Sequence, residues 1–286
     1  MKDKTLVIVM QTDKNNFDFV GKKIVGLTSD EWIEFRLGKN FKKVVRSQRW
    51  GDDKNCVYVC WDDTLADIHS LKQGCCKTKL CMATFAYIQK TLQSFVLDNL
   101  VAKGVTLHDR QGLYIDQRAE VQSGVEIFAP NVICGGVVLK KDTVVYPYCF
   151  LHGCVVGQNC SIGPFATIRP GSVVDDNCRV GNFVEIKNSR LESGVKVAHL
   201  SYVGDARVGQ NTNVGCGVVF ANYDGKTKHF TQVGKDCFLG CNANLVAPLS
   251  IGDGCFVAAG TTVTRNLDKN TFAIGRAKQT TKNRSD

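Results

Sequence analysis

An aliphatic residue recurs at every sixth position along the second half of this chain. One run passes through Val156, Ile162, Ile168, Val174, Val180 and Ile186, and another through Val233, Leu239, Leu245, Ile251, Val257 and Val263. A period of six fits neither a strand nor a helix. It is typical of a left-handed parallel β-helix, in which three hexapeptides form one triangular coil of ~18 residues. Residues one coil apart then lie in columns spaced by about 4.8 Å.

The repeat is less regular outside these two runs. It begins weakly at Ile115, Val121, Ile127 and Ile133, and we expect the inward positions to slip to Val138 and Val144 before Val156. The step from Phe220 to Val233 is too long for one hexapeptide, so the segment NYDGKTKHF should leave the prism as a loop. Irregularity at one place in a regular repeat usually marks a functional face.

The sequence predicts a mainly β protein with four parts. Residues 1–80 have the pattern of a small α/β domain, with strands around Thr5–Met10, Lys23–Leu27 and Cys56–Trp61 and a helix from about residue 30 to 45. Residues 81–104 form a linking helix that stops at Gly104. Residues 105–265 form the β-helix, and residues 266–286 are a basic C-terminal tail.

Composition narrows the functional classes. No run of about 18 apolar residues is present, and the apolar stretch near the start is too short for a signal peptide, so we expect a cytoplasmic protein without a membrane partner. The formal net charge is +9, but the basic residues are scattered along the sequence, and no nucleic-acid-binding module accompanies them. Phosphorylated small molecules would satisfy the same charge.

Fourteen cysteines are spread along the chain. Four of them occupy the small inward site of the repeat, where a thiol packs as a compact apolar group: Cys160, Cys178, Cys237 and Cys255. A second cluster has a spacing that fits no standard zinc pattern: Cys56, Cys60, Cys75, Cys76 and Cys81. We favour buried free thiols over a metal for that cluster and predict no metal site.

One outward column contains a histidine followed by small residues. It runs through Asn182, His199, Cys216, Cys241 and Ala259, two positions past the openings of the third face. A long thin ligand could lie along such a track. Small residues also suit tight corners, and the column alone leaves both interpretations open.

A second column stacks two cations. Arg169 and Lys187 lie in consecutive coils, where they repel each other unless an anion such as phosphate lies between them. Glu185 stacks against Tyr202 beside them. An ordinary solvated corner carries similar mixtures of charge, so that alternative stays open.

A phosphate clamp, an imidazole and a narrow track together suit acyl transfer from acetyl-coenzyme A to a phosphorylated amine. His199 could accept a proton from the attacking amino group, because imidazole titrates near neutrality. Glu185 is the candidate to hold the tautomer of His199. No metal is needed for this reaction.

Several motifs from Arg169 onward resemble the acetyltransferase domain of the bifunctional GlmU enzymes, which make UDP-N-acetylglucosamine. They are IGPFATIRPG, VGNFVEIKNSRL, AHLSYVGDA, NVGCGVVFANYDGKTK, LVAPLSIGDG, VAAGTTVTRN and FAIGRAKQT, in order, within about residues 84–282. The resemblance implies a homotrimer that acetylates glucosamine 1-phosphate, with sites between subunits.

By this resemblance each residue receives a role. His199 is the general base, and the sugar phosphate is bound by Arg169, Lys187, Tyr202 and Asn213, with Lys228 reaching in from a neighbouring subunit. The residues expected to line acetyl-coenzyme A are Cys216, Asn222, Tyr223, Cys241, Ala259 and Arg276. The cysteines at 216 and 241 depart from the usual Ala and Ser.

The N-terminal part departs further from that family. It has no L-x-x-G-x-G-T-x-M loop to cradle nucleotide phosphates, although Asp62 or Asp63 resembles a relic of the metal-binding acid of a nucleotidyltransferase. We therefore expect no uridylyl transfer, and a separate uridylyltransferase would act alongside this protein.

Three alternatives remain. The acceptor could be another phosphorylated or nucleotide-linked amino sugar. A non-catalytic trimeric assembly protein would use the prism only for association, but it has no need of a histidine beside a carboxylate. A zinc hydratase of the same fold needs several converging histidines, and only His199 of the five lies at this corner.

Overall fold

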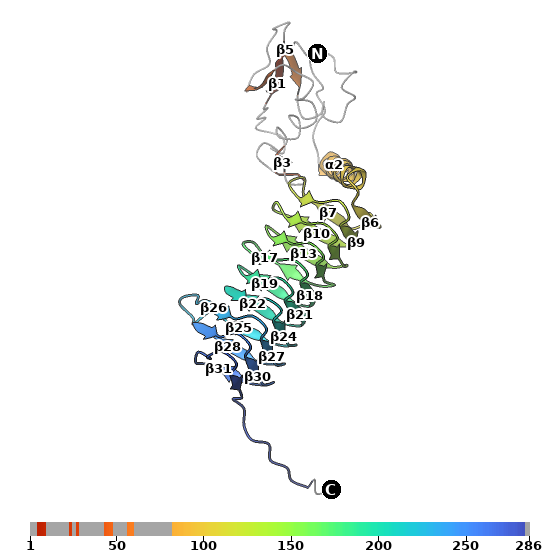
Figure 1. Cartoon of the computed structure of the whole chain (residues 1–286). Helices are drawn as coiled ribbons and strands as arrows, with labels where there is room; N and C mark the ends of the chain where they lie inside the picture. Colours follow the sequence, from red (N-terminus) through yellow and green to blue (C-terminus); the bar gives the residue numbers. More distant parts are fainter. Residues whose placement is uncertain are drawn as a thin grey trace. The chain divides into compact units, whose positions relative to one another are not determined.

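The computed structural model describes the chain from residue 82 to residue 283, together with the backbone of five short strands within residues 5–59. The chain divides into two compact units, Met1–Val96 and Leu97–Asp286. Figure 1 shows the elements of each unit.

The first unit contains a small parallel sheet. Its central strand β1 (Thr5–Val9) pairs with β4 (Lys43–Ser47) on one side and β5 (Cys56–Val59) on the other, and β2 (Lys23–Ile24) pairs with β3 (Leu27–Thr28). The helix predicted for residues 30–45 is wrong at its end, because the β-branched Val44 and Val45 lie in β4 and pair with β1. The other predictions for this part concern residues outside the described ones: positions 29–42, Asp62, Asp63 and the cysteines from Cys60 to Cys81.

The predicted linking helix is present as α2 (Met82–Ala102). It stops where predicted, because Gly104 adopts a φ of 86°, which favours glycine. The amides of Gly104 and Val105 then bond back to the carbonyls of Val101 and Leu100. These bonds satisfy carbonyl groups that the end of a helix leaves unpaired.

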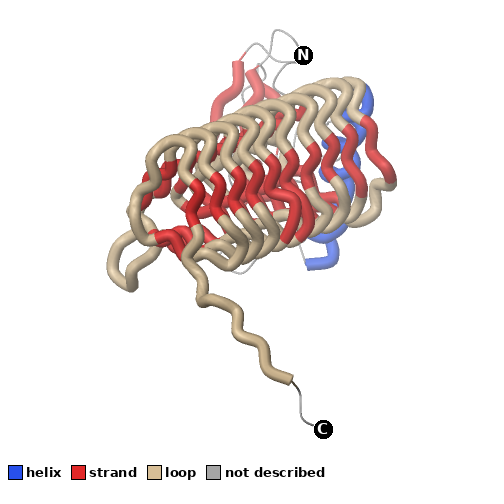
Figure 2. The backbone as a smooth tube through the Cα atoms, turned by 60° about the horizontal axis from the view of Figure 1, so that its bottom comes forward, coloured by secondary structure: helices blue, strands red, loops and turns tan. Residues whose placement is uncertain are grey.

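The second unit is the predicted parallel β-helix, whose three faces the chain visits in turn (Figure 2). Face 1 consists of β7 (Leu113–Ile115), β10 (Asn131–Cys134), β13 (Cys149–His152), β16 (Thr167–Ile168), β19 (Glu185–Lys187), β22 (Tyr202–Gly204), β25 (Val219–Ala221), β28 (Asn244–Val246) and β31 (Thr262–Val263). Face 2 consists of β8 (Glu120–Val121), β11 (Val138–Leu139), β14 (Val155–Val156), β17 (Val173–Val174), β20 (Arg190–Leu191), β23 (Ala206–Val208), β26 (Thr231–Val233) and β29 (Leu249–Ile251). Face 3 consists of β6 (Thr106–His108), β9 (Glu126–Phe128), β12 (Val144–Val145), β15 (Ser161–Ile162), β18 (Arg179–Asn182), β21 (Lys196–His199), β24 (Asn213–Val214), β27 (Phe238–Leu239), β30 (Phe256–Val257) and β32 (Phe272–Ala273).

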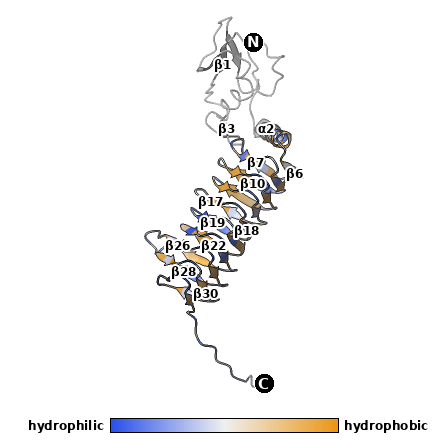
Figure 3. Cartoon of the chain, in the orientation of Figure 1, coloured by the Kyte–Doolittle hydropathy of each residue, from blue (hydrophilic) through white to orange (hydrophobic). Residues whose placement is uncertain are grey.

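The aliphatic residue that opens each hexapeptide points into the prism and forms its core. Ile162, Ile168 and Val180 are completely buried, and apolar strand segments recur along the whole stack in Figure 3. The expected slip to Val138 and Val144 is wrong. Only one residue of each two-residue strand can face inward, and pairing with Val156 and Ile162 selects Leu139 and Val145.

The four cysteines assigned to the small inward sites are buried and free, as predicted. They lie at the corner that precedes face 3 and pack as apolar groups. Burial raises the pKa of the Cys237 thiol.

One segment leaves the regular coils, and the stack of coils ends later than predicted. Residues 222–230 leave the prism between β25 and β26, as predicted, and a bridge between Tyr223 and Lys228 closes this loop. The predicted boundary at residue 265 is too early, because Leu267 pairs with Ile251 and β32 adds a strand to face 3. Beyond β32 the chain extends away from the prism (Figure 2).

The corner between faces 3 and 1 carries large apolar side chains on left-handed backbone. Tyr148, Phe165, Phe183 and Leu200 have φ angles of 62°, 57°, 56° and 42°, a region that bulky residues rarely adopt. The three aromatic rings stack with centroid distances of 4.8 and 5.0 Å. All four side chains are exposed in the protomer.

Candidate active site

Arg169 and Glu185 form the first pair of the site on face 1. Ile168 and Ile186 are register partners, so Arg169 and Lys187 follow them in consecutive coils, as the column argument requires. The Arg169 guanidinium donates a hydrogen bond of 2.9 Å to the Glu185 carboxylate. Glu185 was expected to orient His199, but its partner in this protomer is Arg169.

Lys187 belongs to a more buried network centred on Asp205. Its ammonium donates a 2.9 Å hydrogen bond to the Asp205 carboxylate, and the two side chains are only 15% and 11% exposed. Asn188 and Asn222 donate to the same carboxylate. This hydrogen bond from Lys187 to Asp205 raises the pKa of Lys187. Burial alone would raise the pKa of Asp205, but the bonds from Asn188, Lys187 and Asn222 lower it.

Asp205 is a residue that the sequence analysis missed. It follows Gly204, the register partner of Lys187. The signal in the sequence that could have identified Asp205 was therefore its position beside the cation column, one coil further on. Its carboxylate balances the charge of Lys187 and fixes the direction of that side chain.

Lys228 lies near the end of the excursion loop. It was expected to reach in from a neighbouring subunit, but in this structure it approaches Lys187 of its own chain. Contact with Lys187 lowers the pKa of Lys228, and the positive charge of Arg169 acts in the same direction. Three cations thus converge around two carboxylates, Glu185 and Asp205. An anion bound there would relieve the repulsion between the two lysines.

Tyr202 pairs with Glu185 in register, as expected, and its ring bends toward the cation column. A Cβ at Gly204 would collide with the phenol ring and hydroxyl of Tyr202. The glycine therefore makes room for the Tyr202 hydroxyl beside Lys187.

His199 lies at the corner between faces 3 and 1, at the end of β21. It pairs with Asn182, and its side chain is exposed. Within residues 82–283 the Ser201 hydroxyl donates a hydrogen bond to the backbone carbonyl of His199, and the His199 imidazole makes no hydrogen bond. The ring is therefore available to a ligand.

The column beyond His199 is present as predicted. Val197, Val214, Leu239 and Val257 are in register, so Cys216, Cys241 and Ala259 follow at the same corner. Cys216 and Cys241 are exposed free thiols. Arg276 follows β32, and its side chain reaches back to this column, where the guanidinium donates a 2.5 Å hydrogen bond to the carbonyl of Ala259.

Three other predicted site residues lie away from, or bond away from, the cations and the column that they were expected to join. Asn213 lies on face 3, away from the cations of face 1. Asn222 is only 7% exposed, and its amide is bonded to Asp205 instead of facing the column. The exposed Tyr223 donates its hydroxyl hydrogen to the carbonyl of Gly225 within the excursion loop.

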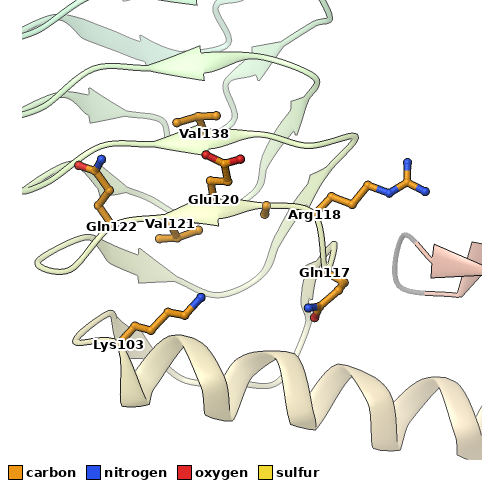
Figure 4. Close-up of a pocket in the computed structure, with 8 residues that line it drawn as sticks. Lys103, Gln117, Arg118, Glu120, Val121, Gln122 and Val138 are labelled. Carbon is orange, nitrogen blue, oxygen red and sulfur yellow. The ribbon is translucent and has the colours of Figure 1, made fainter. Parts of the chain in front are cut away.

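A cavity elsewhere in the second unit shares no residue with the candidate site. Figure 4 shows it near the start of the prism, where Lys103, Arg118 and Glu120 line it.

No helix among the described residues has the length and apolar character needed to cross a membrane. In the same part of the chain, no three His, Cys, Asp or Glu side chains gather in a way that could hold a metal ion.

Comparison with known families supports the repeat assignment. Residues 153–188 match the bacterial transferase hexapeptide family, and residues 231–265 match the hexapeptide repeat of succinyl-transferases. In the sequence, the two segments flank the stretch that contains His199, Asp205 and the excursion loop.

Curated relatives confirm the resemblance to GlmU. The bifunctional protein GlmU of Clostridium acetobutylicum is 39% identical over 211 residues, which cover 68% of this chain and 46% of the relative. That of Staphylococcus haemolyticus is 41% identical over 212 residues, covering 68% and 47%. The chain therefore spans about half the length of the relatives that it matches.

Solved structures give weaker similarity. The UDP-N-acetylglucosamine acyltransferase of Francisella novicida is 16% identical with a TM-score of 0.27, covering 55% of this chain and 60% of that one. A mutant GDP-perosamine N-acetyl transferase of Caulobacter crescentus, solved with CoA and GDP-perosamine, is 18% identical with a TM-score of 0.19, covering 95% and 93%.

Proposed function

From the similarity to GlmU and the three cations that converge on face 1, we propose that this protein transfers an acetyl group from acetyl-coenzyme A to the amino group of glucosamine 1-phosphate. The proposal is carried by the convergence of Arg169, Lys187 and Lys228 on face 1, together with the exposed His199 imidazole at the corner that precedes this face. It suits an acceptor with one phosphate and one nearby amine. The product would be N-acetylglucosamine 1-phosphate, a precursor of UDP-N-acetylglucosamine.

In the proposed mechanism His199 accepts a proton from the acceptor ammonium. The freed amine attacks the thioester carbonyl carbon, a C–N bond forms, and the C–S bond breaks as the tetrahedral intermediate collapses. The departing thiolate of coenzyme A takes up the second proton that the nitrogen loses on becoming an amide, the amide product is released, and His199 returns its proton to solvent. No metal takes part in these steps.

The chain's own residues would position both substrates. The phosphate lies against Arg169, Lys187 and Lys228, which places the amine toward His199 at the adjoining corner. The pantetheine arm follows the small side chains of Cys216, Cys241 and Ala259, with Arg276 near its far end. Holding the two reactants in this geometry removes much of the entropic cost of their encounter.

We further propose a homotrimer with the site between subunits. The exposed stack of Tyr148, Phe165 and Phe183, continued by Leu200 next to His199, leaves an apolar strip beside the site. Such strips usually mark contact surfaces. A neighbouring subunit there would also bring its own face 3, including Asn213, toward the acceptor. We place the reaction in the cytoplasm.

The decisive experiment is an acetyl-transfer assay with the purified full chain across a panel of amino sugars. We expect glucosamine 1-phosphate to have the highest kcat/KM, with free glucosamine much poorer. Preference for a nucleotide-linked amino sugar would replace the acceptor while keeping the chemistry. No transfer to any of them would favour the assembly-protein alternative.

The proposal also includes the absence of uridylyl transfer. Incubation with UTP, magnesium and N-acetylglucosamine 1-phosphate should release no pyrophosphate, and a separate uridylyltransferase would then complete the nucleotide sugar. Pyrophosphate release by the purified chain would overturn this part.

A further inference from the structure

The excursion loop 222–230 is held together by the carboxylate of Asp224. That carboxylate accepts hydrogen bonds of 2.7 Å from the amides of both Lys226 and Thr227. The Thr227 hydroxyl donates a further bond of 3.1 Å. One acidic side chain therefore closes the tip of the loop onto its own backbone.

His229 completes this arrangement from the returning strand of the loop. Its Nε2 lies 2.7 Å from the Asp224 carboxylate and 3.1 Å from the Thr227 hydroxyl. Because a carboxylate only accepts hydrogen bonds, Nε2 carries a proton and donates it to Asp224. The bond from His229 is the largest cause of the lowered pKa of Asp224.

The backbone of His229 is fixed as well. Its amide donates a 2.7 Å hydrogen bond to the carbonyl of Asn222, whose side chain is bonded to Asp205. Lys228 immediately precedes His229 and forms a bridge with Tyr223. The backbone of Lys228 is thus held by its bridge to Tyr223 and by the anchored His229 that follows it. The side chain of Lys228 is exposed.

We propose that His229 is a positioning residue that presents Lys228 to Arg169 and Lys187, so that the three cations together form an anion clamp. The pair of His229 and Asp224 restrains the loop so that the Lys228 ammonium stays beside Lys187. An exposed ion pair contributes little to global stability, but it shifts the population of a surface loop. This inference rests on the proposed function only for the identity of the anion as a sugar phosphate.

The size of the effect depends on how often the loop holds Lys228 beside Lys187. If loss of the His229 side chain lowers the fraction of the competent loop to about one tenth, the apparent affinity for the anion falls about tenfold. His229→Ala should then raise KM for the phosphorylated acceptor about tenfold while kcat changes less than about twofold. His229→Gln keeps an amide donor at similar reach and should restore most of the affinity.

Double variants distinguish positioning from an independent contact. Lys228→Ala should weaken acceptor binding by itself, and adding His229→Ala to it should change KM by less than about twofold. Additive effects of the two substitutions would overturn the proposal. His108→Ala is the matched control, because His108 pairs with Glu126 at 2.9 Å near the start of the prism, far along the chain from the clamp.

Two measurements do not depend on acetyl transfer. Hydrogen exchange of the amides in loop 222–230 should accelerate in His229→Ala and stay unchanged in Lys228→Ala. Calorimetry with inorganic phosphate should show equal weakening by the two substitutions and none by His108→Ala. Unchanged exchange in His229→Ala, or unchanged phosphate binding, would contradict the proposal, whereas inactivity of the wild type toward every amino sugar would contradict only the proposed function.

Discussion

The Lys187 ammonium and the Asp205 carboxylate, 18 residues apart in sequence, meet at 2.9 Å between consecutive coils of face 1. Both side chains are largely buried, and two asparagines donate to the same carboxylate. The pair therefore fixes one cation of the proposed clamp before any ligand arrives. It also links the clamp to the base of the excursion loop through Asn222.

Asp205→Asn should destabilise the prism by about 1.5–3 kcal/mol, the usual range for a lost hydrogen bond to a charged group. Thermal or urea unfolding of the two proteins measures the difference. Because the pKa of Asp205 is lowered in the folded state, its contribution is present above the unfolded pKa of about 4 and disappears as the pH falls through the lower folded value. The stability gap between the proteins should therefore shrink on acidification below about pH 4, and a gap independent of pH would refute this role.

His199→Ala should lower kcat by about 10²- to 10⁴-fold, the range for loss of a general base. The imidazole is exposed and unbonded within the described residues, so the fold should be unaffected. Steady-state kinetics measure the loss, and light scattering with a thermal melt verifies that assembly and stability are retained. Wild-type turnover in this variant would rule out the mechanism.

Arg169→Ala should act mainly on the acceptor. We expect KM for the sugar phosphate to rise about tenfold or more, because a charge-assisted contact to phosphate is lost, while KM for acetyl-coenzyme A stays close to its wild-type value. Arg190→Ala is a matched control, since Arg190 forms a similar exposed ion pair with Asp175 on face 2. Equal effects of the two substitutions would mean that Arg169 is an ordinary surface residue.

Cys216 and Cys241 should be the thiols of the prism most reactive toward alkylating reagents, and acetyl-coenzyme A should protect them. Both are exposed, whereas burial raises the pKa of Cys149 to about 11 and that of Cys154 to about 12, which lowers the fraction of each present as the reactive thiolate. Peptide mapping by mass spectrometry with and without saturating cofactor measures the protection. Equal labelling in the two samples would remove the cofactor from this column.

The sequence by itself determined the architecture. A period of six is typical of a coil in which each hexapeptide forms one face and three hexapeptides complete one turn. The faces, the columns and the excursion at residues 222–230 therefore followed from spacing. The stacking of Arg169 with Lys187 and of Glu185 with Tyr202 followed in the same way, because coil register converts sequence separation into adjacency.

Only the tertiary structure decided which side chains bond to one another. Column positions place Cα atoms but not the ends of long side chains, so Glu185 could be placed near both His199 and Arg169, and its bond goes to Arg169. The inward choice of Leu139 over Val138 was equally undetermined, since both are apolar and only pairing with the neighbouring coil selects one. Asp205 and the His229–Asp224 pair depend on contacts between a coil corner and an irregular loop, where no repeat fixes the geometry.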